Sequence, residues 1–152
     1  MRVSSGLYEE KTDAIAYYPI RNPGQFAQDV YDHVDREAMK LGYIIVQHHP
    51  HDGKSRHPCT EQLICTSKAN VSTFSTVLFE SMVAGVPAIQ ILPKDVESPM
   101  DYPNRFETAK EALDFINKND LGKQNEWIKK HCVCDGNSTE RFVEGLKEIC
   151  NG

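Results

Sequence analysis

The sequence predicts an α/β fold in which a parallel sheet is flanked by helices. Short apolar runs that suit buried strands alternate with longer segments in which apolar residues recur every three to four positions. Such alternation implies right-handed crossovers and therefore parallel strands. The expected strands are 13–19, 43–47, 69–73 and 86–92; the expected helices are 23–41, 58–66, 74–84, 108–119, a segment around Trp127, and a last helix after Asn137. We therefore expect one Rossmann-like domain over residues 1–152.

The first strand and helix are marked by proline and by apolar spacing. Residues 13–19 form a short apolar run that ends at a proline. Asn22 is expected to cap the next helix, with Pro23 at its first helical position. The amphipathic stripe of this helix is Phe26, Val30, Val34, Ala38 and Leu41. Gly42 ends the helix, and the second strand follows it.

The C-terminal third is predicted to be mostly helical. The proline-rich segment Pro93–Pro103 shows no pattern of regular structure. Thr108 with Glu111 makes a capping box, and Asn137 with Glu140 makes another capping pair. The apolar stripe of the last helix consists of Phe142, Val143, Leu146 and Ile149.

Composition excludes several classes of function. The net charge of −5 argues against nucleic-acid binding, which usually needs a basic patch. No run of 18 apolar residues is present, and the N-terminus lacks the apolar core of a signal peptide, so we expect a cytoplasmic protein. The five cysteines are an odd number, and Cys132-Val133-Cys134 has too short a spacing for the usual zinc motif. We expect free thiols and neither a metal nor a cofactor.

A hydroxyl-rich loop opens the helix expected at 74–84. Its hydroxyls belong to Ser72, Thr73, Ser75 and Thr76. A helix N-terminus presents unpaired N–H groups and partial positive charge, so this loop could bind a phosphate. Glu80 lies one turn further along, where it could reach a ribose hydroxyl. The alternative is that these side chains are ordinary helix caps.

Three histidines follow the second strand: His48, His49 and His51. Imidazole can hydrogen-bond a phosphate, and in its charged form it can stabilise a leaving diphosphate. Pro50 would fix the backbone after His49. Two alternatives stay open, a metal site built from this histidine loop and a solvated loop without function.

Basic residues are expected near the same edge of the sheet. Lys54 and Arg56 follow the histidines, and Arg21 follows the first strand. Because ligands of parallel sheets bind at the carboxyl ends of the strands, the histidine and hydroxyl loops should lie on one edge. Arg21 and the two other cations could attract a nucleotide there, or could simply be solvated.

These motifs together resemble a known family. A strand ending in His-Pro, then a Ser/Thr-rich loop opening a helix that reads STxxxESMxxGVPAI, is similar to the C-terminal half of GT-B glycosyltransferases. The likeness is to CDP-glycerol glycerophosphotransferases, capsule polysaccharide transferases and bacterial polysialyltransferases. It implies that His49-Pro50 and Ser75-Thr76 bind the phosphates of the donor nucleotide. The resemblance extends to Phe106–Ala109 and to a DGxxxxR segment, Asp135–Arg141, whereas Ser67–Val71 is more polar than the strand expected there.

The resemblance implies a donor-binding domain of a glycosyl- or glycerophosphotransferase of surface polysaccharide synthesis. The donor would be a CMP-, CDP- or UDP-linked sugar or polyol, and His49 would assist departure of the nucleotide. The acceptor would bind an N-terminal half or a partner subunit that this chain lacks. The uncovered surface could favour homodimers, and the enzyme could be peripheral at the inner membrane. Alternatives are a UDP-N-acetylglucosamine 2-epimerase-like domain and a non-catalytic interaction module.

Overall fold

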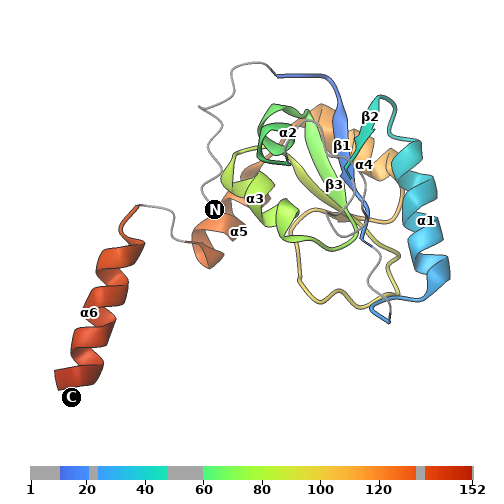
Figure 1. The fold of residues 1–152 in the computed structure, drawn as a ribbon. Coiled ribbons are helices and arrows are strands. Elements are labelled where there is room, and N and C mark those ends of the chain that lie inside the picture. Colours follow the sequence, from blue (N-terminus) through green and yellow to red (C-terminus); the bar gives the residue numbers. More distant parts are fainter. Residues whose placement is uncertain (1–10, 21–23, 48–59, 133–135, 152) are drawn as a thin grey trace.

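A five-stranded parallel sheet forms the centre of the protein (Figure 1). The computed structural model describes residues 11–20, 24–47, 60–132 and 136–151. The strands are β1 (Ile15–Tyr18), β2 (Ile44–Val46), β3 (Ala69–Ser72), β4 (Ala88–Ile91) and β5 (Arg105–Phe106). They lie in the order β2-β1-β3-β4-β5, and every neighbouring pair is parallel. The predicted Rossmann-like α/β fold is confirmed, with β5 as a short edge strand that the sequence did not reveal.

Helices cover both faces of the sheet (Figure 1). The helices are α1 (Gln28–Met39), α2 (Thr60–Thr66), α3 (Thr76–Val83), α4 (Ala109–Lys118), α5 (Gly122–His131) and α6 (Ser138–Asn151). Ile15 and Tyr17 of β1 share a core with α1 and α4, whereas Ala16 and Tyr18 share a core with α2. This alternation is what a strand buried on both faces requires. A third core joins α3 to α5.

The first helix begins later than the sequence predicts. It starts at Gln28, and Ala27 is its N-cap, so the predicted start at Pro23 is wrong. Gly24 has a φ of 82°, which is incompatible with a right-handed helix at that position. Asn22 and Pro23 themselves lie outside the described residues. The end of the helix agrees with the prediction, since Gly42 has a φ of 101° shortly after Met39.

The last helix does not bury its apolar stripe on this domain. No residue of α6 is buried, and Phe142 and Ile149 are 67% and 77% exposed. Figure 1 shows α6 lying apart from the sheet and its flanking helices. Amphipathicity predicted the helix correctly. In the part of the chain that the structure describes, no helix combines the length and the apolarity needed to cross a membrane.

Carboxylates from two helices cap the N-terminus of α4. The predicted capping box is present: Thr108 Oγ1 accepts a hydrogen bond from Glu111 N (3.4 Å), and Glu111 Oε2 accepts one from Thr108 N (3.2 Å). Glu37 of α1 adds a tertiary cap, because its Oε2 accepts from Ala109 N (2.9 Å). That backbone hydrogen bond, followed by the bond from Lys40, lowers the pKa of Glu37. Glu111 has a lowered pKa for the same kind of reason, its bonds from Glu107 N and Thr108 N.

We expect Glu37→Gln to flatten the acid dependence of stability. A carboxyl whose pKa is lower in the folded state contributes stability above its unfolded pKa, about 4.3, and loses it as the pH falls through the folded value. At pH 7 the charged cap should be worth roughly 1 kcal/mol, so the variant should be less stable there and nearly equal to wild type near pH 3. Urea unfolding at both pH values measures this. Glu126→Gln on the exposed face of α5 is the control, and an unchanged pH dependence in Glu37→Gln would contradict the prediction.

Candidate functional site

The strand order reverses direction between β1 and β3. The chain passes from β1 to β2 on one side, and then returns past β1 to β3 on the other. The connection after β1 leads to α1 on one face, and the connection after β3 leads to α3 on the opposite face (Figure 1). In open parallel sheets, ligands bind at this reversal, outside the carboxyl ends of the two strands. β3 ends at Ser72, so the predicted hydroxyl loop lies at this point.

The four hydroxyls of the loop divide into two pairs. Ser72 is fully buried and its hydroxyl donates to the carbonyl of Tyr18 (2.7 Å), which joins the ends of β3 and β1. Thr73 is 1% exposed. Ser75 is the N-cap of α3: its Oγ accepts from Val77 N (3.2 Å). Thr76 is the exposed member of the set. Ser72 and Thr73 are thus buried at the end of β3, while Ser75 and Thr76 lie at the helix start.

Glu80 faces the same part of the structure from the next turn of α3. Its Oε2 atom is buried and has no hydrogen-bond partner among the residues that the structure describes. Burial, and then the charge of Glu61, raises the pKa of Glu80. The charge of Glu80 in turn adds to burial in raising the pKa of Tyr18, the last residue of β1. Glu80 is therefore a carboxyl group with unused hydrogen-bonding capacity near the end of β1.

A network of buried hydrogen bonds links β1, β3, α2 and α3 next to the site. Tyr18 donates to Asn70 Oδ1 (3.0 Å), and Asn70 Nδ2 donates to Ser81 Oγ (2.8 Å) and to the carbonyl of Ile64 (3.0 Å). Ser81 Oγ donates onward to the carbonyl of Val86 (3.0 Å). Asn70 made β3 look unusually polar in the sequence, and this network is the reason. Sequence reasoning missed it, although a polar residue between Ala69 and Val71 was a usable signal.

The predicted residues His49, His51 and Arg21 lie outside the described residues. The structure does describe the chain up to Gln47, immediately before the histidines. Gln47 N donates to the carbonyl of Tyr17 (2.8 Å), so β2 delivers the chain to the carboxyl edge beside β1. Within the described residues, no group of three histidine, cysteine or acidic side chains is placed to hold a metal ion.

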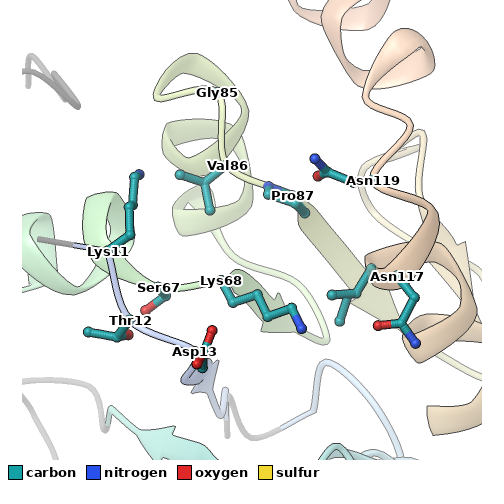
Figure 2. Close-up of a pocket in the computed structure, with 11 residues that line it drawn as sticks. Lys11, Thr12, Asp13, Ser67, Lys68, Gly85, Val86, Pro87, Asn117 and Asn119 are labelled. Carbon is teal, nitrogen blue, oxygen red and sulfur yellow. The ribbon is translucent and has the colours of Figure 1, made fainter.

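A separate hollow of about 490 Å³ lies at the opposite edge, where the strands begin (Figure 2). It is lined by the chain before β1 and β3 and by the ends of α3 and α4, including Lys11, Lys68 and Asn119. Helix C-termini carry partial negative charge, and Lys11 donates to the carbonyl of Cys65 near the end of α2. Lys11 therefore has a structural explanation, and we place the candidate site at the carboxyl edge.

Solved structures of the wall teichoic acid polymerase TagF share the fold of this chain. The wall teichoic acid polymerase TagF matches with a TM-score of 0.55 at 14% identity, over 95% of this chain and 46% of TagF. A histidine-to-alanine variant of TagF matches with a TM-score of 0.54 at 13% identity, over 95% of this chain and 45% of that one. A histidine-to-asparagine variant of TagF soaked with CDPG matches with a TM-score of 0.53 at 15% identity, over 95% of this chain and 46% of that one. No protein-family model and no curated protein matches the sequence.

The likeness to TagF shows a common fold. The chain spans less than half the length of these TagF structures, while nearly all of the chain is covered by the match. The shared fold covers one part of TagF, and the sequence motifs likewise resemble one half of an enzyme.

Proposed function

We propose that residues 1–152 form the donor-binding domain of a glycosyl- or glycerophosphotransferase of surface polysaccharide synthesis. The observation that carries the proposal is the N-terminus of α3, which lies at the strand-order reversal where parallel sheets bind ligands. An anion is favoured there by the helix dipole and by the unpaired N–H groups of the first turn. The likeness to TagF, which has been studied with CDPG, supports a nucleotide-linked donor.

In this proposal the donor phosphates lie against the start of α3. Thr76 offers an exposed hydroxyl, and Ser75 fixes the helix start through its cap. His49 hydrogen-bonds the phosphate and stabilises the departing nucleotide, with His51 and Arg21 on the rim. Glu80, which has an unused acceptor, hydrogen-bonds a ribose hydroxyl. The acceptor comes from a second domain or subunit, which completes the cleft.

Calorimetric titration with CMP, CDP, UDP and GDP tests the proposal. We expect one nucleotide to bind, and we expect both His49→Ala and Thr76→Val to weaken it. Thr76→Val replaces only the hydroxyl by a methyl group. Ser75 is better changed to glycine than to alanine, because losing an N-cap to alanine costs about 1 kcal/mol and would confuse stability with binding.

The matched control is Thr66→Val. Thr66 ends α2 at the opposite edge, where its hydroxyl donates to the carbonyl of Gln62 (2.8 Å). This variant should bind the nucleotide as wild type does. A donor domain alone can bind weakly, so a silent titration is repeated by NMR at millimolar ligand. Silence there, or affinity indifferent to His49 and Thr76, would leave a non-catalytic module on the same fold.

A further inference from the structure

Two side chains hold the hydroxyl loop from outside by its carbonyl groups. Gln90 of β4 donates through Nε2 to the carbonyl of Thr73 (2.8 Å). Tyr102 donates through its hydroxyl to the carbonyl of Ser75 (2.8 Å). Burial raises the pKa of Tyr102 to about 12, so the phenol keeps its proton and remains a donor. The loop before α3 is therefore held at two alternate peptide units.

The proline-rich segment between β4 and β5 contains Tyr102 and also contacts Gln90. Gln90 Nε2 also donates to Ser98 Oγ (2.8 Å), and Ser98 Oγ donates to the carbonyl of Met100 (2.5 Å). Tyr102 N donates to that same carbonyl (3.0 Å). At the other end of the segment, Arg105 Nη2 donates to the carbonyl of Val96 (2.5 Å). The sequence shows no regular pattern here, but side-chain hydrogen bonds fix the segment and present Tyr102 to the loop.

Gln90 is costly to place in the core. It is fully buried, and in the described part of the chain its Oε1 atom has no hydrogen-bond partner. An unsatisfied buried acceptor destabilises a protein, and such a group in a native structure calls for an explanation. Ile89 and Ile91 on either side pack into the core on the other face of the sheet. We explain the buried Gln90 by its Nε2 group, which donates both to the carbonyl of Thr73 in the hydroxyl loop and to Ser98 Oγ.

We propose that Gln90 and Tyr102 are positioning residues that aim two backbone N–H groups at the donor phosphate. A trans peptide unit is planar, and its C=O and N–H point in opposite directions. Holding the carbonyl of Thr73 therefore directs the N–H of Phe74 away from Gln90. Holding the carbonyl of Ser75 directs the N–H of Thr76 away from Tyr102. The inference rests on the proposed function, and it names the donors that bind the anion.

Tyr102→Phe is the sharpest test, because it removes one hydroxyl group. The carbonyl of Ser75 still accepts from Leu78 N (3.1 Å), so no acceptor is left unpaired and the fold should persist. The probes are inorganic pyrophosphate, cytidine, and the nucleotide that binds wild type best. We expect affinity for pyrophosphate and nucleotide to fall about fivefold or more, equivalent to one kcal/mol or above, with affinity for cytidine unchanged. General damage to the fold would weaken all three.

Amide chemical shifts give a second readout. In wild type, pyrophosphate should shift the amide resonances of Phe74 and Thr76 more than those elsewhere, and Tyr102→Phe should reduce the shift of Thr76. Gln90→Met tests the role of Gln90 directly. If that variant fails to fold, Ser98→Ala tests it instead, because Ser98 is half-buried and accepts a hydrogen bond from Gln90 Nε2. Tyr43→Phe is the control, since Tyr43 is 69% exposed and precedes β2 at the opposite edge.

The outcomes separate the two proposals. If wild type binds neither nucleotide nor pyrophosphate, the proposed function fails, and this inference fails with it. If wild type binds, but Tyr102→Phe and Ser98→Ala bind equally well with the same Phe74 and Thr76 shifts, the positioning role is overturned and the proposed function stands.

Discussion

Replacing Asn70 by alanine is expected to lower the free energy of unfolding by about 3 to 4 kcal/mol. Asn70 is fully buried on β3, and its amide joins Tyr18, Ser81 and the carbonyl of Ile64. Its loss strands the buried hydroxyl of Tyr18 without an acceptor, and each such unsatisfied group costs about 1–3 kcal/mol. A cavity adds to this cost. The Tyr18 hydroxyl cannot escape by ionising, because burial raises its pKa far above the ordinary value.

A double-mutant cycle identifies the cause of the loss. Tyr18→Phe removes the stranded hydroxyl, so Asn70→Ala should cost at least about 1 kcal/mol less in the Tyr18→Phe background than in wild type. Urea unfolding followed by circular dichroism measures the four proteins. Asn125→Ala is the control, because Asn125 is exposed on α5 and should change stability by no more than about 0.5 kcal/mol. Additive losses would show that cavity formation, and not the hydrogen bond, dominates.

The alternation of strands and helices could be predicted because burial on both faces selects it. The predicted strands became β1 to β4; three of them are short apolar runs, β3 is interrupted by Asn70, and all four pack against a core in the structure. β5 has two residues, and it exists because Leu92 N donates to the carbonyl of Phe106 (3.0 Å). A strand of two residues is too short to show the alternation of apolar and polar residues by which strands are recognised in a sequence.

The hydroxyl loop shows where residue type alone stops being informative. Side chains alternate along a strand, and Ala69 and Val71 face the core beneath α1 and α4. Ser72 therefore points to the other face, where its bond to Tyr18 occupies it. The alternation of side chains along β3 could have shown in advance that Ser72 lies on this face. The hydrogen bonds from Gln90 and Tyr102 to this loop could not be predicted, because they join residues that are 17 and 27 positions apart in the sequence.

The predicted site and the observed fold agree on one edge of the sheet. The hydroxyl loop and the chain just before the histidines both reach the carboxyl ends of the strands. Motif order alone could not establish that they converge, because convergence depends on β1 lying between β2 and β3. The site residues stay predictions, and the donor titration is their test.

Leu78→Ala is expected to lower the free energy of unfolding by about 3 kcal/mol, within the range of 2–5 kcal/mol typical of buried leucines. Leu78 is fully buried two residues into α3, and its core contains Met82, Tyr102 and Trp127. The loss combines the transfer of the removed methyl groups with the cavity that they leave. Residues of α3, α5, β4 and the segment before β5 surround this core and limit how far it can collapse.

Trp127, the single tryptophan, makes the effect visible by fluorescence. Its ring lies 5.8 Å from that of Tyr102 and 6.1 Å from that of Phe79, so it reports on the packing of α3 against α5. Leu146→Ala is the matched control: it removes the same atoms from the exposed face of α6, and should change stability by about 0.5 kcal/mol at most. Equal losses in the two leucine variants would mean that α6 packs in solution as tightly as α3. A small loss in Leu78→Ala alone would mean that this core relaxes into the space. Because Tyr102 shares this core and donates to the carbonyl of Ser75, a large loss would show that the packing around Leu78 also supports the start of α3.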